Sequence, residues 1–154
     1  MKNKIFNGRA IVIIASTLII LTACSKDNNT REKSYSLTAN GTSGVTGQVR
    51  ITEIQGKKFN LTVDLNKSIK DTLHIVKVYS GRVNSEGDLL IDMGTVKGTG
   101  SNLSLSKTQI DSVLINGQNK YFTYDSLVNY NAYVKVLHSA FRPDSVLTKG
   151  NIGK

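Results

Sequence analysis

The chain has 154 residues, with 20 Lys and Arg against 11 Asp and Glu, and its one cysteine excludes an internal disulfide. That length suits a single domain with one hydrophobic core. Apart from Lys2, Lys4 and Arg9, the basic residues are scattered and form no run or helical stripe, so we expect no nucleic-acid partner.

The N-terminus has the pattern of a secretory signal. Lys2, Lys4 and Arg9 precede the uncharged, mostly apolar residues 10–23, a stretch shorter than the roughly 20 residues that a membrane-spanning helix needs. The following Leu-Thr-Ala-Cys, ending at Cys24, resembles the lipobox of bacterial lipoproteins. The resemblance implies a cleaved signal peptide over 1–23 and palmitate-type acyl chains on Cys24, which would bind the mature protein to a membrane.

Residues 24–34 are predicted to be the lipidated cysteine and a flexible tether, because 25–33 contain no apolar side chain to bury. Cys-Ser-Lys-Asp at 24–27 is similar to the export tag of surface lipoproteins of the Bacteroidota. An ordinary solvated linker explains the segment equally well. We therefore expect the outer membrane of the cell envelope and leave open whether the domain faces the periplasm or the surface.

From residue 35 onwards, apolar and polar residues alternate, as in strands with one face on a core. The alternation predicts strands near 35–39, 45–52 and 59–65, with a hairpin loop at 55–58. It assigns four side chains of the second and third of these strands, and two of later strands, to the core: Val49, Ile51, Leu61, Val63, Ile91 and Val134.

The second half gives less regular signals. A continuous apolar run predicts a central strand over 73–79, and polar and glycine residues predict a loop over 80–88. The stretch 108–124 is ambiguous, whereas 123–128 could form one capped helical turn. Further strands are predicted at these positions: 89–93, 103–105, 132–137 and 146–152.

Two segments are similar to a known domain family. Residues 45–51 followed by 59–63 resemble the opening hairpin of CHRD (chordin-type) domains. Residues 124–136, with the closing Lys-Gly-Asn-Ile-Gly at 149–153, resemble CHRD-like lipoproteins of the Bacteroidota. The resemblance implies an all-β, antiparallel immunoglobulin-like β-sandwich of about eight short strands over 35–154. It implies little about activity, because a fold does not determine function.

Two histidines bear on metal binding. CHRD-like domains often carry Ala-His-Ile-His in a central strand, a spacing that echoes the copper strand of Cu/Zn superoxide dismutases; here the second histidine is replaced by Val76 after His74. His138 lies one residue beyond the family's later histidine, and a shift of one residue turns a side chain to the other face of a strand. Two histidines are too few for a usual zinc or copper site, so we expect no metal and no other cofactor, with structural hydrogen bonds for both rings.

The chain carries no recognisable catalytic motif. No nucleophile elbow is present, and Gly94, Gly98 and Gly100 lack the spacing of a phosphate-binding loop and its following Lys-Ser/Thr. The sequence therefore predicts a protein that is not an enzyme.

A tripeptide of Asp, then Ser or Thr, then an aliphatic residue occurs four times. It is similar to the O-glycosylation sequon of periplasmic and surface proteins of the Bacteroidota. Turn and cap formation by Asp-Ser explains it equally well, and both interpretations stay open. The hydroxyl residues concerned are Thr72, Ser112, Ser126 and Ser145.

These observations favour a lipid-anchored protein of the cell envelope, with a non-catalytic β-sandwich that binds an envelope protein or a glycan or has a structural role. One alternative is a metal-dependent enzyme of superoxide-dismutase type, which the histidine count disfavours. Another is an accessory subunit of an envelope complex, which would expose a large apolar patch.

Overall fold

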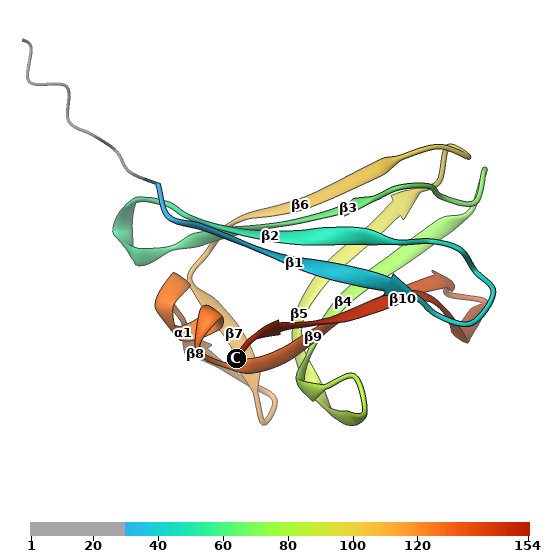
Figure 1. Cartoon of the computed structure of the whole chain (residues 1–154). Coiled ribbons are helices and arrows are strands. Elements are labelled where there is room, and N and C mark those ends of the chain that lie inside the picture. The colour runs from blue at the N-terminus through green and yellow to red at the C-terminus, as the bar shows by residue number, and fades with distance from the viewer. Residues whose placement is uncertain (1–29) are drawn as a thin grey trace, which may run out of the picture.

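A computed structural model describes residues 30–154, and its fold is all-β and antiparallel, as the sequence predicts (Figure 1). The predicted signal peptide and Cys24 lie outside the described residues. The elements are β1 (Glu32–Ala39), β2 (Gly47–Glu53), the 3-10 turn η1 (Gln55–Lys57), β3 (Phe59–Leu65), β4 (Leu73–Arg82), β5 (Ser85–Lys97), β6 (Leu103–Ile110), β7 (Ser112–Ile115), β8 (Gln118–Tyr121), α1 (Tyr124–Val128), β9 (Asn131–Ser139) and β10 (Arg142–Gly153).

Eight of the strands form one sheet in the order β5-β4-β9-β10-β1-β2-β3-β6, and β7 and β8 form a separate hairpin. Figure 1 shows these strands in two groups, with β1, β2, β3 and β6 in one and β4, β5, β9 and β10 in the other. Buried side chains of both groups belong to a single hydrophobic core. The two groups therefore pack together as halves of one folded sheet.

The two halves are joined through β1. Its first six residues pair with β2, from Glu32 opposite Thr52 to Leu37 opposite Gly47. Its last two, Thr38 and Ala39, pair instead with β10. One strand thus takes part in both halves, which makes the sheet continuous.

The two-residue alternation identified the core correctly. Val49 lies opposite Val63 and Ile51 opposite Leu61 in the β2–β3 pairing. All six side chains assigned to the core are at most 4% exposed. These paired aliphatic side chains stabilise the β1–β2–β3 half through cross-strand contacts and burial.

Two segments differ from the expectation. Strand β1 begins at Glu32, so the last three residues of the expected tether belong to the sheet. The expected loop over 80–88 is a hairpin in which only Val83 and Asn84 lie between β4 and β5. The pairing of these strands is interrupted by three register shifts, and such bulges accommodate the glycine and polar residues that had suggested a loop.

The ambiguous stretch 108–124 forms the end of β6 and the β7–β8 hairpin. Asn116 and Gly117 have φ angles of 52° and 73°, as a two-residue hairpin turn of this type requires. The helical turn expected at 123–128 is α1, and the Thr123 hydroxyl accepts a hydrogen bond from the Ser126 amide at 3.1 Å. Within residues 30–154, no helix is long and apolar enough to span a membrane.

Candidate functional site

The two histidines of the described chain lie next to each other, with ring centroids 6.3 Å apart in an edge-to-face arrangement. His74 is fully buried. Its Nδ1 lies 2.8 Å from the carbonyl oxygen of His138, and its Nε2 accepts a hydrogen bond from the Ile69 amide at 3.0 Å. A carbonyl only accepts and an amide only donates, so the ring is neutral and carries its proton on Nδ1.

Both nitrogens of His74 are thus used to hold the backbone. The ring fixes the loop 66–72 against the end of β9, and Gly98 packs directly on it. A Cβ at Gly98 would lie 2.0 Å from the Ile69 oxygen and 2.8 Å from His74 Nε2, so only glycine fits there. His74 is a positioning residue for this loop, with the structural hydrogen bonds that the sequence suggested.

The surrounding carboxylates do not complete a metal site. Asp71 pairs with Lys97 at 3.1 Å and is exposed. Within residues 30–154, no three His, Cys, Asp or Glu side chains lie close enough together to hold a metal ion.

An open pocket of about 370 Å³ lies beside His138 and Ser139, at the end of β9. We call it the end pocket. Leu73 and Phe141 line it and are 56% and 97% exposed. We call Leu73 and Phe141 the end patch; a third exposed apolar residue, Ile69, lies in the loop that His74 fixes. Only one other large apolar side chain of residues 30–154 is exposed, Tyr121. Exposed apolar side chains gathered beside a pocket are typical of a binding surface.

The end patch lies far from the first described residues. Phe141 is at the turn between β9 and β10, whereas β1 begins at Glu32 at the opposite end of the sheet (Figure 1). The last residue of β1, Ala39, pairs with Thr148, and β10 continues beyond it towards the turn. The patch therefore points away from the end at which the predicted tether would enter.

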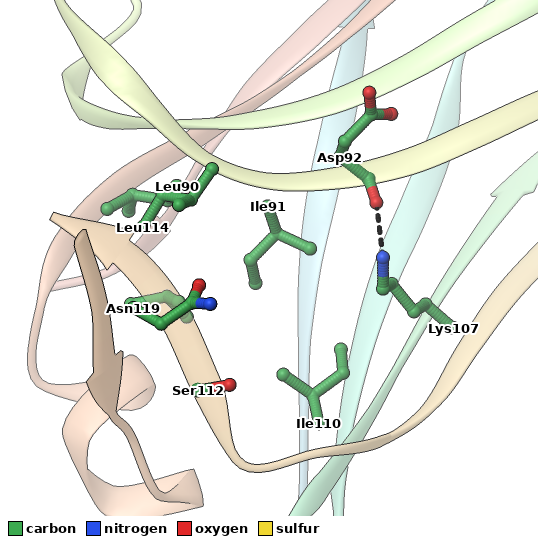
Figure 2. Close-up of a pocket in the computed structure, with 9 residues that line it drawn as sticks. Leu90, Ile91, Asp92, Lys107, Ile110, Ser112, Leu114 and Asn119 are labelled. Atoms are coloured by element: carbon green, nitrogen blue, oxygen red, sulfur yellow. Dashed lines mark hydrogen bonds between the residues drawn. The ribbon is translucent and has the colours of Figure 1, made fainter. Parts of the chain in front are cut away.

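A second pocket, of about 280 Å³, lies between β5, β6 and the β7–β8 hairpin (Figure 2). The side chains of Ile91 and Ile110 extend into it from β5 and β6. The Lys107 side chain extends from β6 towards β5, and its ammonium donates a hydrogen bond to the carbonyl oxygen of Asp92 at 2.6 Å. We call this pocket the edge groove, because β5 and β6 are the two edge strands of the eight-stranded sheet.

Charged side chains fix the start of β1. Arg31 forms two hydrogen bonds to Glu53 and two to Asp125, at 2.6 to 3.0 Å, and its guanidinium lies over the Tyr124 ring. Hydrogen bonds from Arg31 lower the pKa of both Glu53 and Asp125. The hydrogen bonds to these two carboxylates in turn raise the pKa of the Arg31 guanidinium. The cluster links β1 to β2 and α1, so its role in this structure is to hold the start of the sheet in place.

On the face of the sheet away from the core, Tyr133 stacks on Tyr79 with ring centroids 5.4 Å apart. Lys135 lies over both rings and pairs with Glu86. Tyr133 is fully buried, its hydroxyl has no hydrogen-bond partner among the described residues, and burial raises the pKa of its phenol to about 12. A phenol that stays protonated without a partner is suited to packing and not to proton transfer.

The four hydroxyl residues of the Asp-Ser/Thr tripeptides are spread over the domain. Thr72 lies in the turn before β4 and lines the end pocket, and Ser112 is exposed at the start of β7 and lines the edge groove. Ser126 lies in α1, where its hydroxyl is 3.0 Å from that of Thr123, and Ser145 is half-buried in β10. The helix-cap interpretation therefore fits Ser126, while Ser112 has the exposure that a modification site needs.

No protein-family model, no curated protein and no solved structure matches this chain.

Sequence reasoning missed both pockets. The exposed Phe141, in the short turn between two predicted strands, was a signal for the end patch. No local signal marks the edge groove, because it depends on which strands end up at the edges.

Proposed function

We propose that this chain is a lipid-anchored protein of the cell envelope whose β-domain binds a partner without catalysing a reaction. The observation that carries the binding role is the end patch, in which Leu73 and Phe141 are exposed beside a pocket. Exposed apolar side chains on a folded domain cost free energy that a partner's surface recovers when it covers them.

The anchor is supported by the sequence pattern that ends at Cys24. The end patch lies at the opposite end of the sheet from β1. A domain attached through residues that precede β1 would present this patch away from the anchoring membrane, towards other envelope components. This geometry favours an envelope protein as the partner, with a glycan as the competing candidate.

The anchor is tested by labelling with radioactive palmitate in an outer-membrane-containing host. The wild type should incorporate label and be processed, whereas Cys24→Ser should remain unlabelled and unprocessed. A wild type that takes up no label would contradict the anchor.

The binding role is tested by mild crosslinking in native membranes, followed by pull-down. We expect Phe141→Ser to abolish the captured partner, because it removes the most exposed apolar side chain of the end patch. The matched control is Tyr121→Ser, which removes the exposed aromatic ring outside the patch. Equal capture by both variants would reject the end patch as the binding surface, and loss of capture after treatment with a glycosidase would identify a glycan partner.

A further inference from the structure

The lining of the edge groove combines buried apolar side chains with exposed polar ones. Ile91, Ile110 and Val113 line it and belong to the hydrophobic core, at 4%, 6% and 2% exposed. Lys107 of β6 and Asn119 of β8 also line it, and both are exposed (Figure 2). A concave site of this kind suits a small molecule with an apolar body and a polar end.

The charge of the groove comes from Lys107. Among the described residues that line the groove, it is the only cation. An ammonium carries three donors, and the carbonyl oxygen of Asp92 accepts one of them at 2.6 Å. None of the ion pairs formed within residues 30–154 includes Lys107. The remaining donors of this ammonium are therefore available to an anion that enters the groove.

The carboxylates nearest to the groove in the chain are engaged elsewhere. Asp92 contributes only its backbone carbonyl to Lys107, and Figure 2 shows its carboxylate turned away from the ammonium. That carboxylate accepts a hydrogen bond from the Gly94 amide at 2.8 Å. Asp111, between β6 and β7, pairs with Lys58 at 3.2 Å. A carboxylate brought by a ligand would thus complement a cation that these residues do not neutralise.

The volume of the groove limits the size of its ligand. An apolar cavity of about 150 Å³ holds benzene, with its six carbon atoms, so the groove's volume of about 280 Å³ has room for roughly eight to twelve non-hydrogen atoms. An unbranched carboxylic acid of this size has roughly six to ten carbon atoms.

We propose that the edge groove binds a monocarboxylate with a short aliphatic chain. The chain lies against Ile91, Ile110 and Val113, where it is removed from water, and the carboxylate accepts a hydrogen bond from the Lys107 ammonium. Acetate lacks the chain and an alcohol lacks the charge, so neither satisfies both parts of the groove. This inference concerns a different pocket from the end patch, and it holds whether or not Cys24 carries lipid.

The test is an NMR titration of the full chain in lipid nanodiscs at pH 7, with the isoleucine δ1-methyl groups labelled with carbon-13. The probes are hexanoate, butanoate and 1-hexanol. Hexanoate should shift the Ile91 and Ile110 signals saturably and leave that of Ile69, which lies outside the groove, unchanged. Butanoate should bind about fifteenfold more weakly, because each methylene group withdrawn from water contributes about fourfold. 1-Hexanol should bind about threefold to tenfold more weakly than hexanoate, because it forms no ion pair with Lys107.

Two pairs of variants locate the binding. Lys107→Met should bind hexanoate about threefold to tenfold more weakly and 1-hexanol as the wild type does. Its matched control is Lys120→Met, which removes a lysine of β8 outside the lining and should leave both affinities unchanged. Asn119→Trp places a large ring at an exposed position of the lining and should abolish the shifts, whereas Lys120→Trp should retain them.

The proposal is overturned if hexanoate gives no saturable shift of Ile91 and Ile110, or if 1-hexanol binds as tightly as hexanoate. Equal hexanoate affinity in Lys107→Met and Lys120→Met would also overturn it. Phe141→Ser, which alters the end patch, should bind hexanoate as the wild type does, and loss of hexanoate binding in that variant would contradict the assignment to the edge groove. Capture of a macromolecular partner through the end patch and binding of hexanoate can therefore fail independently.

Discussion

His74 donates a hydrogen bond from Nδ1 to the carbonyl oxygen of His138 at 2.8 Å, while the two rings meet edge to face. The only two histidines of the chain are therefore neighbours, yet their contact is a link between a side chain and the backbone. One ring holds the loop that carries part of the end pocket, and the other lines that pocket.

The first prediction concerns this link. His74→Phe should lower the free energy of unfolding by about 2–6 kcal/mol, because it leaves the Ile69 amide and the His138 carbonyl without their partner, at roughly 1–3 kcal/mol each. His138→Phe should cost less than about 1 kcal/mol, since the only hydrogen bond of its ring among the described residues is a long one, of 3.4 Å, to the Ser139 hydroxyl, and a phenyl ring can keep the edge-to-face contact with His74. Urea unfolding of both variants measures the difference, and equal losses would contradict the assigned role of His74.

The second prediction is that the protein purified without an affinity tag contains no stoichiometric metal. Both nitrogens of His74 are engaged with the backbone, so a metal could bind this ring only by displacing one of them. Elemental analysis should give far less than one equivalent of zinc or copper per chain, and no superoxide dismutation should be detected. One equivalent of metal that is lost in His74→Ala would overturn this prediction and favour the enzyme alternative.

The third prediction concerns Arg31 and its two carboxylates. Arg31→Met should raise the pKa of Glu53 and of Asp125 towards their ordinary values, as measured by NMR titration. A carboxyl whose pKa is lowered by folding contributes stability that is present above its ordinary pKa and is lost as the pH falls through the folded value. The variant should therefore be less stable than wild type at pH 7 but lose less stability on acidification.

Lys58→Met is the matched control for Arg31→Met. It removes the cation that lowers the pKa of Asp111, and it should leave Glu53 and Asp125 unchanged. If the pKa values of Glu53 and Asp125 in Arg31→Met equal those in the wild type, the hydrogen bonds seen here do not persist in solution.

The fourth prediction concerns the buried phenol of Tyr133. Tyr133→Phe should be at least as stable as wild type at pH 7, because it removes a buried hydroxyl that has no hydrogen-bond partner among the described residues. Burial raises the folded pKa to about 12, so the wild type should lose stability as the pH rises from about 10 towards 12, where only the unfolded chain ionises. Denaturation between pH 8 and 11.5 should give a flatter profile of stability against pH for Tyr133→Phe than for the wild type, and equal slopes would contradict the raised pKa.

The fifth prediction concerns the tripeptides. The intact mass of the protein from its native host should exceed that of the lipidated polypeptide, and joint substitution of Thr72, Ser112, Ser126 and Ser145 by Ala should remove the excess. We expect peptide mapping to find the modification on Ser112 before Ser126, because Ser112 is exposed, whereas Ser126 is half-buried with its hydroxyl 3.0 Å from that of Thr123, the N-cap of α1. A native mass equal to polypeptide plus lipid would favour the turn and cap interpretation for all four.

Local patterns in the sequence were sufficient for much of the fold. The alternation in β2 and β3 predicts both the strands and their buried faces, because a two-residue period places one face on the core wherever the strand lies. The Thr123 cap likewise predicts α1, since capping depends on neighbours three residues away. Bulges in the β4–β5 hairpin and the Asn116-Gly117 turn were missed or left ambiguous, since polar and glycine residues there resemble a loop.

The pockets could not be predicted in the same way. The edge groove exists because β5 and β6 end the strand order, and this depends on pairings between residues far apart in the chain. The pocket beside the end patch includes Asp71 and Thr72 of the loop that His74 holds, a contact that spacing alone does not reveal. Sequence could therefore suggest that His74 is structural without identifying the surface that it shapes.

The position of β10 in the sheet has a consequence for how the protein reaches its folded state. The last strand of the chain lies between β9 and the first strand, β1, so the half that contains β4, β5 and β9 is incomplete, and is not joined to β1, until the C-terminal residues are available. Pairing between the two ends of the chain is slow, since loop closure must precede the contacts that reward it. A polypeptide with this topology completes its eight-stranded sheet only after synthesis has reached its last residues.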